Sequence, residues 1–168
     1  YDRIEHINGQ RVSVPSLGYV MLDNIKSGVY ESVKASMPPV LENEYYKVEF
    51  SDNGSISSIY DKELGRNIIK PDSQCNLLMY TSDNHKSFRT PVSADFEIYE
   101  DDSAIGVIAE IRENICGAKI IQKVSLLKYE KMIEIDNKIE HAKEMVNDNR
   151  YYRYLYYAFP FYVSNCRR

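Results

Sequence analysis

Histidine side chains are the first groups of this sequence that could bind a metal ion or transfer a proton. The three histidines, His6, His85 and His141, stand alone in the chain. Zinc sites usually combine His or Cys ligands in short-range pairs, and no His-x-His or His-Glu-x-x-His pattern occurs. The spacing therefore favours surface or packing histidines over metal ligands.

The cysteines offer no metal site or disulfide framework either. Cys75, Cys116 and Cys166 are far apart and odd in number, which fits neither a set of disulfides nor a zinc knuckle. We therefore expect buried free thiols in a reducing compartment, and on that basis a cytoplasmic location.

Acid–base chemistry would need convergent carboxylates or histidines. Asp83-Asn84-His85 sits in a polar loop, and loops on rigid sheets often carry function. The same residue types also bend and cap the backbone, and without a second convergent motif we favour the turn interpretation. Asp101-Asp102 and Asp148 are interpreted in the same way. The sequence thus indicates no catalytic or metal-binding residue and leaves any substrate-binding residues unknown.

Glycine and asparagine motifs add little to the search for a site. The seven glycines are isolated turn residues, whereas phosphate-binding loops cluster them before a helix. Asn53-Gly54-Ser55 matches the N-glycosylation pattern, but it falls where a tight turn is needed in any case.

Composition excludes two classes of partner. The net charge is −4 and the pI is about 5.5, with Lys and Arg spread along the chain, so the clustered basic surface of a nucleic-acid-binding protein is absent. The chain has no long apolar run, so we expect no membrane span. Fifteen tyrosines and no tryptophan suit half-buried sheet faces, and we favour packing over sugar stacking as their main role.

The spacing of turn residues is typical of an all-β domain. Turn signals recur at intervals of roughly 8–12 residues, and Asn8-Gly9 between two short apolar stretches predicts a hairpin. Tyr46, Val48 and Phe50 alternate with charged residues, which predicts a half-buried strand. Further strands are expected over residues 19–25, 55–60, 66–70, 75–81, 96–102, 105–111, 119–129 and 151–163.

Two segments are harder to interpret. Residues 32–43 contain Pro38-Pro39, and because proline cannot donate to a β-ladder we expect a linker there. Apolar residues from Met132 to Val146 fit both a helix and a strand. The β-rich surroundings favour a strand that extends to about His141.

Both termini lead us to expect a segment of a larger protein. The chain begins at Tyr1 directly ahead of a strand-like stretch, and Cys166-Arg167-Arg168 follows an aromatic strand without a closing turn.

Several motifs occur in a fixed order along the chain. They are Val14–Tyr19 (VPSLGY), Glu42–Phe50 (ENEYYKVEF), Asn53–Glu63 (NGSISSIYDKE), Gly65-Arg66 and Tyr157–Phe161 (YAFPF). This ordered set resembles the C-terminal β region of family 38 glycoside hydrolases, the α-mannosidases, over nearly the whole chain. Between Tyr80 and Phe96 the family often has a Pro- and Trp-rich stretch that this chain lacks, which leaves the subfamily and the sugar linkage open.

The resemblance implies an all-β, antiparallel β-sandwich of the supersandwich, galactose-mutarotase-like type, present here in incomplete form. Residues 1–31 would end a preceding small β domain, 32–43 would be the linker, and 44–168 would form the N-terminal part of the C-terminal sandwich. We expect an exposed sheet edge or apolar face as a consequence, and self-association through it.

The resemblance also implies a parent enzyme that hydrolyses α-mannosides with retention. Its upstream domain would hold a Zn²⁺ ion and a nucleophilic Asp, and none of those motifs maps onto this chain. The chain would then support that active site and be inactive alone. Residues 151–157 and 83–89 are the expected contributors to its rim.

Two other functions stay open. A freestanding carbohydrate-binding module would use exposed tyrosines in flat rows on one sheet face. An aldose-epimerase-like enzyme would need a His and a Glu in one cleft, which three scattered histidines disfavour, and analogy of fold alone does not support it.

Overall fold

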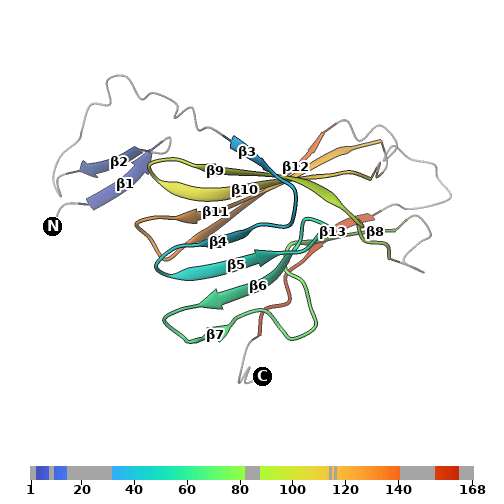
Figure 1. The fold of residues 1–168 in the computed structure, drawn as a ribbon, viewed down its shortest axis with the longest axis horizontal. Coiled ribbons are helices and arrows are strands. Elements are labelled where there is room, and N and C mark those ends of the chain that lie inside the picture. Colours follow the sequence, from blue (N-terminus) through green and yellow to red (C-terminus); the bar gives the residue numbers. More distant parts are fainter. Residues whose placement is uncertain are drawn as a thin grey trace.

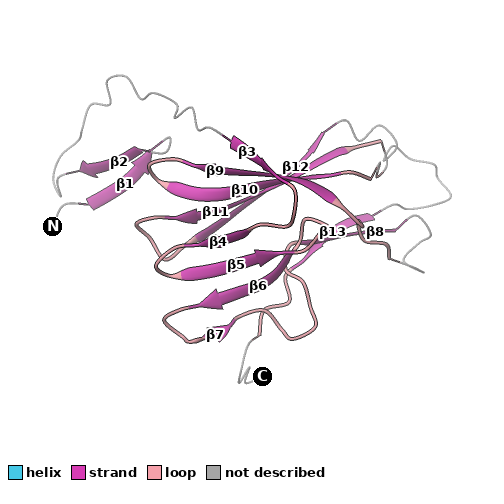
Figure 2. Cartoon of the chain, viewed as in Figure 1, coloured by secondary structure: helices cyan, strands magenta, loops and turns pink. Residues whose placement is uncertain are grey.

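The computed structural model describes residues 3–7, 10–14, 32–81, 88–113, 115, 117–140 and 154–162, with only the backbone described in the first two ranges. Within these ranges the chain forms strands and turns and no helix (Figure 2). The strands are β1 (Arg3–Ile7), β2 (Gln10–Val14), β3 (Ser32–Ala35), β4 (Val40–Glu42), β5 (Tyr46–Phe50), β6 (Ile56–Asp61), β7 (Arg66–Asn67), β8 (Leu77–Thr81), β9 (Ala94–Glu100), β10 (Ala104–Ile111), β11 (Lys119–Leu127), β12 (Ile133–Glu140) and β13 (Tyr154–Ala158).

The strands form two main antiparallel sheets (Figure 1). One sheet has five strands in the order β12-β11-β10-β9-β3, and the other has four in the order β4-β5-β6-β7. Strands β8 and β13 form a separate two-stranded ribbon, and β1 pairs with β2 in the hairpin predicted around Asn8-Gly9.

The core lies between the inner faces of the two sheets. Val48 and Ile59 of the four-stranded sheet and Val107 of the five-stranded sheet are each at most 2% exposed and belong to one cluster. Phe50 and Phe96 join the sheets directly through an edge-to-face contact with ring centroids 6.5 Å apart. Alternating side chains from two facing sheets are what define a β-sandwich, so the predicted antiparallel β-sandwich is confirmed.

The turn at residues 51–55 shows how local chemistry sets the register of β5 and β6. Gly54 has a φ of +84°, a conformation that favours glycine, and its N–H donates to the Ser51 carbonyl. The Asn53 side-chain oxygen accepts from both the N–H and the hydroxyl of Ser55. Its amide nitrogen donates to Gln74 at 3.1 Å, so the N-glycosylation motif is used within the turn.

Residues 32–43 contain two strands, so the expectation of an irregular linker there was wrong. β3 pairs with β9 and β4 pairs with β5, and Leu41 of β4 is fully buried in the core. Pro38-Pro39 lie where the chain crosses from one sheet to the other, and the Pro39 carbonyl still accepts a hydrogen bond from the Phe50 N–H at 3.3 Å. The prolines therefore exclude a continuous strand but not a strand on either side. The boundaries proposed between domains stay a prediction.

The ambiguous segment after Met132 is a strand, as favoured. β12 pairs with β11 over its whole length, and Ile133 and Ile135 pack against the core. A helix there would leave the edge of β11 unpaired, which explains why the tertiary context decides between two local patterns.

Asp61 joins two turns at one end of the sandwich. One carboxylate oxygen accepts from the N–H groups of Glu63 and Leu64, so Asp61 caps the turn that follows β6. The other lies 3.0 Å from Nζ of Lys131, in the turn between β11 and β12, and the Asp61 side chain is only 5% exposed. Burial raises the Asp61 pKa, but the hydrogen bonds from Leu64 and Lys131 outweigh it and hold the pKa below its ordinary value.

Asp61→Asn is expected to lower the free energy of unfolding by about 1–3 kcal/mol at neutral pH, because a buried acceptor loses its charge-assisted partner. A carboxyl group with a lowered pKa contributes stability above its ordinary pKa, and that contribution is lost as the pH falls through the lowered pKa. The difference between the two proteins should therefore shrink in acid. Urea unfolding at a series of pH values measures it.

Glu63→Gln is the matched control for this change. Glu63 contacts the same lysine, but its side chain is 73% exposed, and exposed ion pairs contribute little. A loss at Glu63 as large as that at Asp61 would contradict the assignment of the effect to the buried cross-link.

Candidate functional site

The β8–β13 ribbon brings together the two segments that the sequence predicted at a rim. Phe88, from the end of the 83–89 segment, contacts Tyr156 of the 151–157 segment with ring centroids 5.9 Å apart. The backbones of Tyr80 and Arg89 exchange two hydrogen bonds of 2.8 and 2.9 Å, which fix Phe88 beside the ribbon. Asp83, Asn84, His85 and residues 151–153 lie outside the described residues.

The ribbon has an inner and an outer face. Leu78, Tyr80, Leu155 and Tyr157 pack on the core. Because side chains alternate along a strand, their neighbours lie on the other face, where Leu77 pairs with Ala158, Met79 with Tyr156 and Thr81 with Tyr154. We call this second set the outer ribbon face.

Aromatic rings gather on the outer ribbon face. The rings of Tyr154 and Tyr156 have centroids 6.0 Å apart and planes within 17° of parallel. Tyr156 is 41% and Phe88 is 44% exposed. Tyr156 and Phe88 therefore present aromatic rings to solvent, whereas Thr81 of the outer ribbon face is buried and the opposite face of the same strands packs on the core.

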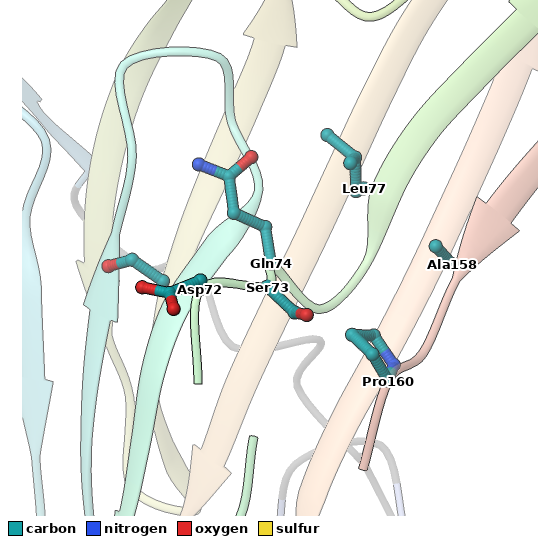
Figure 3. Close-up of a pocket in the computed structure, with 7 residues that line it drawn as sticks. Asp72, Ser73, Gln74, Leu77, Ala158 and Pro160 are labelled. Carbon is teal, nitrogen blue, oxygen red and sulfur yellow. The ribbon is translucent and has the colours of Figure 1, made fainter. Parts of the chain in front are cut away.

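A depression of about 590 Å³ adjoins this face. Figure 3 shows Gln74 and the turn before β8 on one side, with Leu77, Ala158 and Pro160 on the other. One wall is thus polar and the other is apolar. The seven lining residues define what we call the ribbon depression; they are Ser57, Asp72, Ser73, Gln74, Leu77, Ala158 and Pro160.

Backbone and side-chain hydrogen bonds fix the walls of the ribbon depression. The Lys70 N–H donates to the Pro160 carbonyl at 2.9 Å, which ties the polar turn to the end of β13. Nε2 of Gln74 donates to the Ser51 hydroxyl at 2.9 Å, and its Oε1 accepts from Asn53. Asp72 is exposed, with a φ of +58° in the turn that carries it. A carboxylate and a serine hydroxyl are therefore presented at the rim of a preformed hollow.

A buried amide cluster supports the ribbon from below. Asn76 is fully buried directly before β8, and its amide exchanges hydrogen bonds of 2.7 and 3.1 Å with Asn137 of β12. Nε2 of Gln122, from β11, donates to the Asn76 carbonyl at 3.0 Å. These bonds attach the start of the ribbon to the inner face of the five-stranded sheet.

Tyr157 completes this cluster from β13. Burial raises its pKa to about 12, and the nearby Gln122 side chain has a smaller effect in the opposite direction. Oε1 of Gln122 and the Tyr157 hydroxyl are buried, and neither makes a well-formed hydrogen bond within the described part of the chain. The phenol stays protonated at neutral pH, so it serves as a packed neutral group rather than a base.

The described residues do not form a metal centre. Across the ranges given above, no three His, Cys, Asp or Glu side chains are grouped so that they could hold a metal ion. Burial raises the pKa of the Cys75 thiol to about 11, which suits the predicted buried free thiol, and Asp101 accepts from Ser103 and Ala104 in a turn as predicted. His6 lies on β1, whereas His85, His141, Asp148, Cys116 and Cys166 fall outside the described residues.

The zinc ion expected for the parent enzyme therefore has no set of ligands among these side chains. The described ranges also contain no helix that is long and apolar enough to cross a bilayer.

Sequence reasoning missed the polar wall of the ribbon depression. Asp72, Ser73 and Gln74 follow Pro71 in a short run of turn-forming residues, and that run was the available signal. Nothing local indicates that the turn would lie against Ala158 and Pro160, more than eighty residues later in the chain.

The fold and this site define the chain as an antiparallel β-sandwich domain with an aromatic ribbon at its surface. Residues 41–167 match the family model described as the glycosyl hydrolases family 38 C-terminal domain. The chain belongs to this family, which confirms the resemblance and sets the domain in the context of a glycoside hydrolase. No curated protein matches the chain.

Proposed function

We propose that this chain is an accessory β-sandwich of a retaining glycoside hydrolase that acts on α-mannosides. Family membership over residues 41–167 is the observation that carries the proposal. In it, the catalytic centre and its zinc ion belong to an upstream domain of the same polypeptide in the cytoplasm, and the exposed sheet edges of this segment allow self-association.

The ribbon suits the role of a support for a neighbouring site. Its inner face is anchored by Leu78, which is 1% exposed, and by the buried amide cluster of Asn76, Gln122 and Asn137. Its outer face presents Tyr156, and Phe88 lies beside it, held by the backbone hydrogen bonds between Tyr80 and Arg89. Groups that bind substrate work best when the surrounding packing holds them in place, and the packed inner face of the ribbon provides such support.

The first test is hydrolysis of an aryl α-mannoside by the full-length parent enzyme and by this chain alone. We expect the zinc-loaded parent to cleave it with retention of anomeric configuration, and to prefer it at least tenfold over the α-glucoside and α-galactoside. The isolated chain should show no turnover. Proton NMR of the first-formed sugar gives the stereochemistry.

Two results would count against the proposal. A parent enzyme that prefers another glycoside would remove the assignment to α-mannosides. Turnover by the purified chain that survives chelation would show that a catalytic centre lies within these residues.

A carbohydrate-binding module is the second candidate. The near-parallel rings of Tyr154 and Tyr156 favour it, because aromatic rows on a sheet face are the feature expected of such a module. If the isolated chain binds sugars, and if abolishing that binding leaves hydrolysis by the parent enzyme unchanged, the chain is a binding module rather than an active-site support.

A further inference from the structure

We propose that the outer ribbon face and the ribbon depression together form a saccharide-binding site of this chain. One pyranose ring would lie against Tyr156 and Phe88, and a neighbouring unit would occupy the ribbon depression between Leu77 and Asp72. The site itself is inferred from the geometry of the described residues. Only the choice of α-mannosides as its ligands rests on the proposed function.

The two parts of the site are continuous along the ribbon. Leu77 and Ala158 form the apolar wall of the depression, and the next outward-facing pair is Met79 and Tyr156. Outward-facing pairs on a ribbon are separated by about 7 Å, twice the rise of a strand residue. Adjacent units of one oligosaccharide can therefore contact the depression and the rings at the same time.

The chemistry of the surface matches a sugar ring. A pyranose has a face of C–H groups and an edge of hydroxyl groups, and the electron-rich face of an aromatic ring attracts polarised C–H groups. Ligand sites pair such apolar contacts with a few well-placed polar groups. Here Tyr156 and Leu77 provide the first kind of contact, and Asp72 and Ser73 provide the second.

Charge selects among ligands that could stack on these rings. Asp72 places a carboxylate at the rim of the ribbon depression, where it accepts hydrogen bonds from hydroxyl donors and repels anions. The site therefore suits a neutral saccharide better than a phosphorylated or sulfated one. A hydroxyl-rich ligand also explains why a polar wall faces an apolar one across a single hollow.

The site is largely preformed, which reduces the entropy lost on binding. Tyr156 is flanked by Tyr154 and Phe88 at centroid distances of 6.0 and 5.9 Å. The turn that carries Asp72 is tied to the end of β13 through the Lys70–Pro160 hydrogen bond. An open site of this size still predicts weak binding, with a dissociation constant on the order of 1 mM.

The experiment is an NMR titration of the 168-residue chain with α-linked mannobiose. Cellobiose and mannose 6-phosphate serve as comparison probes. We expect binding of mannobiose and weaker binding of the phosphorylated sugar. Tyr156→Ala should weaken binding about fivefold to tenfold, the effect expected of one aromatic contact, and Asp72→Ala should weaken it by a similar factor. Tyr156→Phe keeps the ring and should retain binding.

Tyr129→Ala is the matched control, because Tyr129 is also exposed, at 50%, but lies in the turn between β11 and β12. Its substitution should leave binding unchanged. The amide spectrum of each variant shows whether it is folded. Asp72→Ala, at an exposed position in a turn, keeps the test decisive if Tyr156→Ala does not fold.

Failure of this inference and failure of the proposed function give different results. If no sugar binds, or if Tyr156→Ala and Tyr129→Ala have equal effects, the saccharide site is wrong even where the parent enzyme cleaves α-mannosides. If cellobiose binds at the same residues and mannobiose does not, the site stands and the assignment to α-mannosides is wrong.

Discussion

Gly106→Ala is expected to lower the free energy of unfolding by about 3 kcal/mol, at the upper end of what overpacking usually costs. A Cβ atom at this position would lie 2.2 Å from Cζ of Tyr99 and 2.4 Å from its hydroxyl oxygen. Such distances are far below van der Waals contact, so the tyrosine ring would have to move. Urea unfolding of the two proteins measures the loss.

Several contacts make displacement of the Tyr99 ring costly in free energy. Tyr99 on β9 lies opposite Gly106 on β10, which in turn lies opposite Ser125 on β11. The ring crosses over the glycine, and its hydroxyl lies 2.5 Å from the Ser125 hydroxyl. The ring is 2% exposed, and the Lys123 ammonium lies 4.7 Å from its centroid. Displacement would expose the ring and separate a buried pair of hydroxyl groups, each of which costs free energy.

Two controls separate this clash from a general effect of the strand. Glu110→Ala, on the same face of β10 but exposed, should change stability by no more than about 0.5 kcal/mol. In a Tyr99→Ala background the ring is gone, so Gly106→Ala should then cost little. An equal cost in both backgrounds would contradict the steric explanation, because contacting residues should be strongly coupled.

Alternating side chains made the inner faces of the strands predictable. Val107, Ala109 and Ile111 repeat with the period of a strand, and all three are buried in the core. That pattern is local, since a strand places every second side chain on one face whatever the rest of the chain does. β3 and β4 were missed because the proline rule describes single positions, whereas these strands end on either side of Pro38-Pro39.

The site was predictable only in pieces. The sequence indicated the segments at Phe88 and at Tyr156 separately, but not their contact, because pairing across a sheet depends on topology rather than on local pattern. Gln122 and Asn137 illustrate the same limit. Each is a polar residue at an inward position of its strand, and its role becomes clear only when Asn76 is brought between them by the chain after β7.

Asn137→Leu is the second change for which we expect a loss of about 3 kcal/mol in the free energy of unfolding. Leucine has the same branching as asparagine and a larger volume, so the change removes hydrogen bonds without opening a cavity. Both polar atoms of the fully buried Asn76 amide would lose their partners, and each unsatisfied buried group costs about 1–3 kcal/mol. Denaturant unfolding should show this loss, while Glu134→Ala on the exposed face of β12 should show almost none.

The consequence for the ribbon follows from where Asn76 lies. It directly precedes Leu77, has a φ of +53°, and receives the Gln122 amide on its carbonyl. Asn76→Gly keeps that backbone conformation but removes the amide, so the double change Asn76→Gly/Asn137→Leu should cost less than the sum of the single changes. Strict additivity would contradict the amide pair as the source of the loss. Because the pair holds the start of β8, Asn137→Leu should also weaken mannobiose binding without touching the sugar, whereas Glu134→Ala should leave it unchanged.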